Sequence, residues 1–194
     1  LTHEDKPYTP KNYDGREHGP VSVRQSLASS LNIPAVLTLE KVGIPQTIHL
    51  ARRLGITSLG DPDEYDLSLA LGGGQMSLLQ LSNAYAAFAN GGTFTGSRLL
   101  LDVQAADGSL VYTESRPTPV QVFDPRVAWL INDILSDDYA RKVGFGENST
   151  LKIERTAAVK TGTTTNFHDN WTIGYTQELL VGVWVGNSNY QAMR

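Results

Sequence analysis

Hydrophobic positions in the first three quarters of the chain recur mostly every three or four residues, the spacing of helices with one buried face. Ser22 followed by Gln25 forms a capping box, which predicts a helix that ends near Ser30. Two further helices are predicted at 35–42 and 45–54, because each has a proline suited to its first turn and a glycine suited to its end. The pattern therefore predicts three consecutive short helices.

The middle of the chain predicts two more helices with a β-hairpin between them. A serine precedes the apolar pattern at 78–89, and an aspartate precedes the proline that opens a helix at residue 125. Strand-like runs near 98–113 meet across an Asp-Gly turn, which is typical of a hairpin. Residues 1–19 are polar and rich in turn formers, so they are expected to form an extended lead-in.

The last quarter changes to strand-like runs at 156–163, 170–176 and 179–186. Short turns between neighbouring runs indicate antiparallel pairing. The third run is apolar on both faces, which predicts a central position in the sheet. The whole pattern predicts an α+β fold, with a mainly helical part at 20–140 and an antiparallel sheet at 156–186.

Composition narrows the function classes. The hydrophobic fraction of 40%, with 18 glycines in 194 residues, is that of a soluble domain. A net charge of −4 gives no general attraction to nucleic acid, and no apolar run is long enough to cross a membrane. The absence of cysteine excludes disulfides and a thiolate nucleophile, and four scattered histidines predict no metal site. Because the chain begins at Leu1, it is expected to be a piece of a longer protein.

Two short motifs carry candidate chemistry. In Lys160-Thr161-Gly162-Thr163, the two threonine hydroxyls emerge on one side of a strand, and glycine lets a ligand approach the backbone. A lysine beside them suits the binding of a carboxylate, although a surface strand explains the same residues. Ser30 and Asn32 fall between two predicted helices, where they can project into a cleft, although Asn32 also suits a simple N-cap.

Taken together with their surroundings, these motifs resemble the transpeptidase domain of class A penicillin-binding proteins, around its Ser-x-Asn and Lys-Thr-Gly motifs. The resemblance runs in order from about residue 8 to residue 186. Asn12-Tyr13-Asp14-Gly15 and Asp169-Asn170-Trp171 most resemble the type called 1C. Other matching segments are 19–27, 30–36, 71–73, 83–92, 158–164, 174–176 and 181–186.

The resemblance implies a penicillin-binding/β-lactamase-like fold that is truncated at both ends. It implies serine acyl transfer at the D-Ala-D-Ala end of a peptidoglycan stem peptide, with β-lactams bound at the same site. No cofactor or metal is expected, and nucleic acid is not expected as a partner. The parent protein is expected to carry a glycosyltransferase domain and to lie outside the cytoplasmic membrane, anchored through a segment that precedes these residues.

The resemblance also implies roles for single residues. Ser30 would relay protons, Asn32 would bind the peptide backbone, and Lys160 would support Ser30 electrostatically. Thr161 and Thr163 would bind the terminal carboxylate, and the Thr163 N–H would contribute to an oxyanion hole. Gly162 and Thr164 belong to the same substrate-binding strand.

The nucleophile of the family, in a Ser-x-x-Lys motif before Ser-x-Asn, has no counterpart in the expected place. The one literal match, Ser149 to Lys152, follows Ser-x-Asn in a loop-like context and is interpreted as accidental. The true serine is expected upstream, so the fragment by itself is expected to be inactive. A further departure is His168, where related sequences of type 1C often carry arginine.

Two non-catalytic alternatives stay open, a penicillin-recognising sensor and a peptidoglycan-binding scaffold. Either of them could share the fold without turnover. A Ser/His/Asp hydrolase using His168 and Asp169 is disfavoured, because the nucleophile-elbow motif is absent. The transpeptidase interpretation requires the Ser30 hydroxyl and the Lys160 ammonium to meet in the folded chain, 130 positions apart.

Overall fold

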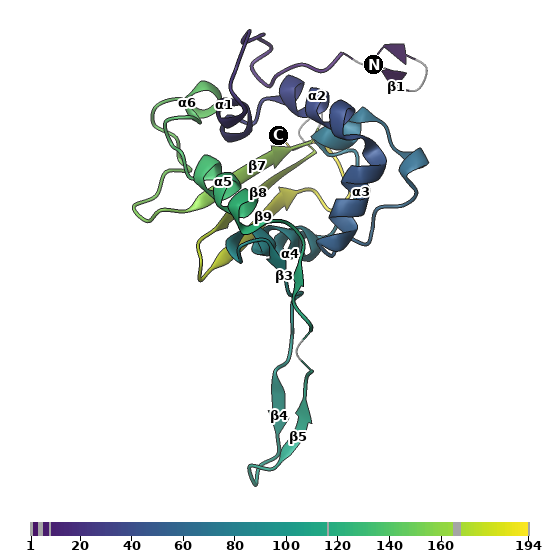
Figure 1. The fold of residues 1–194 in the computed structure, drawn as a ribbon, viewed down its shortest axis with the longest axis vertical. Helices are drawn as coiled ribbons and strands as arrows, with labels where there is room; N and C mark the ends of the chain where they lie inside the picture. The colour runs from purple at the N-terminus through teal and green to yellow at the C-terminus, as the bar shows by residue number, and fades with distance from the viewer. Residues whose placement is uncertain (1, 4–5, 8, 116, 165–167, 194) are drawn as a thin grey trace.

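The chain folds into helices gathered around a three-stranded sheet, and a long β-hairpin projects from this body (Figure 1). The structure is a computed structural model, which describes residues 2–3, 6–7, 9–115, 117–164 and 168–193. Within these residues, none of the helices combines the length and the apolar character that a membrane crossing requires.

Three helices follow the lead-in: α1 (Val23–Ala28), α2 (Asn32–Val42) and α3 (Ile44–Arg53). The predicted capping box is confirmed, since the Gln25 N–H donates to the Ser22 hydroxyl at 3.1 Å. The predicted start of α2 is three residues late. Asn32 is its first helical residue and Leu31 is its N-cap, so the interpretation of Asn32 as an N-cap is wrong.

The middle of the chain contains the two predicted helices and the hairpin. Asp124 caps the second helix through the Arg126 N–H, and Ser77 caps the first through the Gln80 N–H. The stretch from residue 60 to 75, which resembles a loop in sequence, contains two short 3-10 helices. The elements are η1 (Pro62–Glu64), η2 (Leu67–Leu71), α4 (Leu78–Ala89), β4 (Asp102–Gln104), β5 (Leu110–Thr113), α5 (Pro125–Leu135) and α6 (Lys142–Phe145).

Short two-residue strands form two further pairs, β1 (Thr2–His3) with β2 (Lys6–Pro7) and β3 (Thr93–Phe94) with β6 (Val120–Gln121).

The three predicted late strands form one antiparallel sheet in the order β7-β8-β9. Their bounds are β7 (Ala158–Thr163), β8 (Asp169–Tyr175) and β9 (Leu180–Gly186). The prediction that the apolar third run is central is wrong for this sheet, because β8 pairs on both sides and β9 forms an edge. Alternate valines of β9 are accordingly about half exposed.

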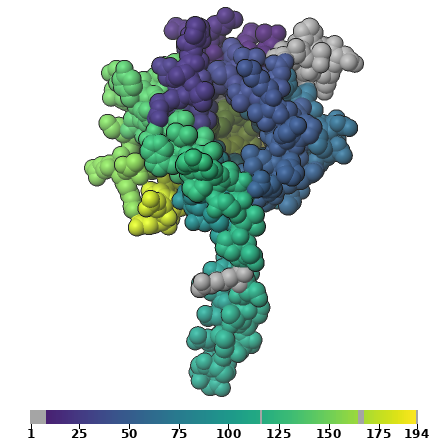
Figure 2. Space-filling view, viewed as in Figure 1, coloured from purple at the N-terminus to yellow at the C-terminus, as the bar shows by residue number. Residues whose placement is uncertain are grey.

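Helices α4 and α5 pack against this sheet, α4 against β8 and β9 and α5 against β7. Ile173 and Tyr175 of β8 are buried in the resulting core together with Leu135 of α5. A second core lies between α3, α4 and the segment that follows α3, where Ile48 is fully buried. Figure 2 shows that the body is hollowed between α5 and the helices α2 and α3, with the sheet at the bottom of the hollow.

Candidate active site

Ser30 lies at a turn that its neighbours define in detail. Helix α1 ends at Ala28, and the Leu31 N–H then donates back to the Ser26 carbonyl at 2.9 Å. Ser30 therefore occupies the left-handed position just after a helix, with a φ of +55°. Glycine is the usual residue at this position, and a serine there stores backbone strain of the kind found at functional sites.

A distant side chain completes the turn at the start of α2. The Oδ1 atom of the buried Asn12 accepts hydrogen bonds from the backbone N–H groups of Asn32 at 3.0 Å and Ile33 at 3.2 Å. It thereby supplies the cap that Leu31 cannot provide. The Asn32 side chain donates to the Lys11 carbonyl at 2.8 Å. The lead-in thus fixes both the backbone and the side chain of Asn32.

The second motif lies on the edge strand β7. Alternation along the strand places Thr161 and Thr163 on one face, as predicted, and Lys160 on the other. Lys160 nevertheless reaches Ser30, because its Nζ donates to the Ser30 Oγ at 2.6 Å and also to the Thr161 carbonyl. The required meeting of Ser30 and Lys160 is confirmed. The candidate site therefore wraps around the free edge of β7.

Burial lowers the pKa of Lys160 to about 8, because removing water from the ammonium disfavours its charged form. The amine is still mostly protonated at neutral pH. Because the ammonium uses a lone pair of the Ser30 oxygen, the hydroxyl proton of Ser30 is free to turn toward another acceptor.

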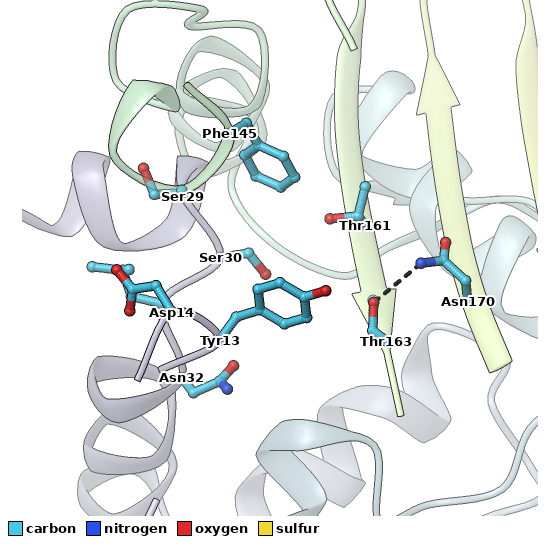
Figure 3. Close-up of a pocket in the computed structure, with 12 residues that line it drawn as sticks. Tyr13, Asp14, Ser29, Ser30, Asn32, Phe145, Thr161, Thr163 and Asn170 are labelled. Carbon is cyan, nitrogen blue, oxygen red and sulfur yellow. Dashed lines mark hydrogen bonds between the residues drawn. The ribbon is translucent and has the colours of Figure 1, made fainter. Parts of the chain in front are cut away.

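A pocket of about 310 Å³ separates the two motifs. Figure 3 shows Ser30 and Asn32 on one wall and Thr161 and Thr163 on the other, with the ring of Tyr13 reaching between them. The lining residues are Tyr13, Asp14, Ser29, Ser30, Leu31, Asn32, Gly144, Phe145, Thr161, Gly162, Thr163 and Asn170. Hydroxyls, amides and two aromatic rings thus face one space, which suits a peptide with polar ends.

Five of the seven candidate residues from the sequence line this pocket. Lys160 does not line the pocket itself, but it contacts Ser30, which does. Thr164 instead closes the end of β7, where its backbone N–H and its hydroxyl both interact with the Asp169 backbone. Gly162 faces Trp171 at ordinary contact distance, so no close approach requires glycine in this structure.

Several lining residues were not identified as candidates from the sequence. Asn170 lies opposite Thr163 in the β7–β8 register and donates to its hydroxyl at 3.1 Å. Its sequence signals are the antiparallel register expected between the two runs and its place in the Asp169-Asn170-Trp171 segment that carries the resemblance. Tyr13 belongs to a motif noted only as a resemblance. Gly144 and Phe145 come from α6, and nothing in their local sequence indicates a site.

The alternative chemistries find no support among the described residues. Ser149 lies in a turn after α6, where its hydroxyl accepts from the Leu151 N–H, and it does not line the pocket. His168 stacks on Tyr190, whereas Asp169 is buried and accepts from the indole of Trp184, so the two do not form a catalytic pair. No group of three potential metal ligands occurs in the described part of the chain.

Comparison with known proteins agrees with this geometry. The family model "Penicillin binding protein transpeptidase domain" matches residues 1–192. Penicillin-binding protein 1A of Neisseria meningitidis is 32% identical over 193 residues, which is 96% of this chain and 23% of that protein. Penicillin-binding protein 4 of Bacillus subtilis is 32% identical over 183 residues, covering 93% of this chain and 28% of that protein.

Solved structures show the same fold. The crystal structure of penicillin-binding protein 1A from Haemophilus influenzae superposes with a TM-score of 0.82 at 23% identity, covering 98% of this chain and 33% of that chain. Penicillin-binding protein A from M. tuberculosis, solved as an imipenem acyl-enzyme complex, gives a TM-score of 0.79 at 19% identity, covering 96% of this chain and 48% of that chain.

The fold is thus that of the penicillin-binding transpeptidases, an α+β architecture as predicted. The chain belongs to the penicillin-binding protein transpeptidase domain family. It spans about a quarter of the length of the curated relatives described above. One of these relatives carries the designation 1A, and type 1C stays a prediction.

Proposed function

We propose that this chain forms the Ser-x-Asn and Lys-Thr-Gly part of a D,D-transpeptidase, which transfers the acyl group of a stem peptide ending in D-Ala-D-Ala to an amine. The contact between the Lys160 ammonium and the Ser30 hydroxyl carries the proposal, because it joins the two motifs at one pocket. Penicillin and related β-lactams would occupy the same pocket.

Each motif has a role in this reaction. The Lys160 ammonium holds the oxygen of Ser30, so that Ser30 can pass its own proton to the departing amine of the terminal D-Ala and take another from the acceptor amine. The hydroxyls of Thr161 and Thr163 face the pocket and suit the terminal carboxylate, which the nearby positive charge also attracts. The Thr163 N–H would contribute to the oxyanion hole, where losing one donor typically costs about 3–4 kcal/mol of transition-state stabilisation.

The attacking serine is proposed to come from a Ser-x-x-Lys segment outside these 194 residues. The half-exposed valines of the edge strand β9 support this, because they offer apolar surface to further elements of the protein. The hollow above the sheet also leaves room for such elements (Figure 2). A location outside the cytoplasmic membrane, where peptidoglycan is cross-linked, follows from the same proposal.

Reversible binding of a β-lactam and covalent acylation by it can be tested separately in this chain. Benzylpenicillin at millimolar concentration should shift the NMR amide signals of residues 160–163, and the Lys160→Met variant should bind it more weakly. The matched control Lys152→Met changes an exposed lysine and should leave binding unchanged. Absence of shifts at residues 160–163 would contradict the proposed binding site.

A fluorescent penicillin should leave no covalent label on the 194-residue chain after denaturation. A label that the Ser149→Ala variant abolishes would show that the nucleophile is Ser149 instead. In the longer protein that supplies Ser-x-x-Lys, labelling should be covalent, and Lys160→Met should slow it about 100-fold or more. The sensor alternative predicts the same acylation but no transfer of a stem peptide to an amine. A cross-linking assay therefore distinguishes a transpeptidase from a sensor.

A further inference from the structure

Helix α6 packs directly against the peptide that precedes Ser30. An ideal Cβ at Gly144 would lie 2.3 Å from the Ser29 carbonyl oxygen and 3.0 Å from its carbon. Both of these are backbone atoms, which cannot rotate away as the end of a flexible side chain can. Only glycine at position 144 therefore allows this approach.

A second contact reinforces the first. The hydroxyl of Ser29, which is only 4% exposed, donates to the Ala140 carbonyl at 2.9 Å. Ser29 thus meets the 140–144 segment through its side chain and through its backbone. We call these two contacts, Ser29 Oγ with Ala140 and the Ser29 carbonyl with Gly144, the α6 latch.

The segment that bears the latch is itself anchored. Arg141 is 2% exposed, and its guanidinium donates to the Leu135 carbonyl and to Asp138. Asp137 accepts both the Ala140 N–H at 2.9 Å and the guanidinium of Arg24, which belongs to α1. The latch therefore joins the end of α1 to a segment already tied to α1 and α5.

The latch acts on the torsion that makes Ser30 unusual. The φ angle of Ser30 is the rotation about its N–Cα bond, and changing it rotates the Ser29 carbonyl relative to the rest of the turn. The hydrogen bonds that end α1 place Ser30 at +55°, a conformation that serine does not favour on its own. The contacts of Ser29 with Gly144 and Ala140 restrain the peptide on the N-terminal side of this torsion. In this conformation the Ser30 hydroxyl reaches the Lys160 ammonium.

We propose that Gly144 and Ser29 are positioning residues, which hold the Ser30 hydroxyl against Lys160 through the α6 latch. The importance of this role for catalysis rests on the proposed transpeptidase function, whereas the latch itself can be tested without turnover. Phe145 follows Gly144 directly and lines the same pocket, so the latch also positions one of the aromatic residues of the site.

The test is a double-mutant cycle read by NMR titration of the Lys160 side chain in the 194-residue chain labelled with ¹³C-lysine. The signal is assigned from its absence in Lys160→Met. In the otherwise unchanged chain, Ser30→Ala removes a hydrogen-bond acceptor of the Lys160 ammonium and should lower the pKa of Lys160 by about half a unit or more, since that bond favours the charged form. In the Gly144→Ala background, the same Ser30→Ala change should shift it by less than half as much.

The control is Gly174→Ala on β8, where a Cβ would meet its neighbours only at 3.8 Å and beyond. In that background the effect of Ser30→Ala should be unchanged. If Gly144→Ala prevents folding, Ser29→Ala takes its place, since it removes the contact with Ala140 without adding volume, and it should also reduce the shift.

A purely structural role would lower stability in these variants while leaving the full Ser30→Ala shift in the folded chain, and that result would overturn the proposal. An absent shift in the unchanged chain would overturn it too, because Ser30 would then not contact Lys160. If the cycle behaves as expected while penicillin leaves residues 160–163 unaffected, the latch stands and the proposed function fails.

Discussion

Replacing Asn12 with alanine should destabilise the fold by about 2 kcal/mol. Asn12 is 5% exposed, and its Oδ1 caps α2 by accepting from two backbone N–H groups, those of Asn32 and Ile33. Loss of a helix N-cap typically costs about 1 kcal/mol. The side-chain Nδ2 also donates to the Arg16 carbonyl at 2.7 Å, and losing such a bond costs roughly another 1 kcal/mol. A loss of about 2 kcal/mol changes the unfolding equilibrium roughly 30-fold.

Urea denaturation of the 194-residue chain, followed by circular dichroism, measures this loss. The Asn12→Asp variant keeps an acceptor for the two N–H groups of α2 but puts a second carboxylate oxygen against the Arg16 carbonyl, so it should also lose stability. It should nevertheless keep the Asn32 and Ile33 amides protected from hydrogen exchange, because their acceptor remains. Asn148→Ala changes an exposed asparagine and should stay within about 0.5 kcal/mol of the original chain.

Faster hydrogen exchange at the Asn32 and Ile33 amides should accompany the Asn12→Ala change, because these two groups lose their acceptor. A loss below about 0.5 kcal/mol in Asn12→Ala, or exchange of the Asn32 and Ile33 amides as fast in Asn12→Asp as in Asn12→Ala, would refute the assignment of Asn12 as the cap of α2.

Two further predictions concern the sheet. The unfolded chain binds a proton at Lys160 more tightly than the folded chain does, so the free energy of unfolding should rise with pH between about 8 and 10.5. Relative to the Lys160→Met variant, this rise should reach at most about 3 kcal/mol. If the free energy of unfolding depended on pH equally in the original chain and in Lys160→Met, the burial of the Lys160 ammonium would be contradicted. Gly182→Ala should destabilise by about 1–3 kcal/mol, because its Cβ would lie 2.4 Å from the Ser82 Oγ and 3.1 Å from Leu78 and Ile173. Urea denaturation checks this, and a loss no larger than that of Gly174→Ala would show that the α4–β9 contact yields without strain.

Local signals predicted most of the elements. Ser22 with Gln25, Ser77 with Gln80 and Asp124 before a proline all open helices where expected, because caps depend on side chains within three residues of each other. The three late strands also lie within about two residues of their predicted bounds. Alternation and turn residues are properties of short segments, which a sequence displays directly.

The predictions from sequence were wrong where a distant segment of the chain decides the local structure. Asn32 has the residue type of an N-cap, yet α2 includes it, since the cap comes from Asn12 twenty residues earlier. The apolar run of β9 indicates burial on both faces but not which strand pairs with it, and in this chain it forms an edge. Neither fact is visible in the segment concerned.

By itself, the sequence determined the succession of helices and strands, the family resemblance and the two motifs that bear the candidate chemistry, because all of these depend on residue types at short spacing. The tertiary structure alone decided that Lys160 lies 2.6 Å from Ser30, that Asn170 and Tyr13 share their pocket, and that Gly144 allows α6 to approach Ser29. The physical reason is that side chains more than a hundred residues apart meet only through the packing of α1, α5 and β7, and this packing depends on the whole core.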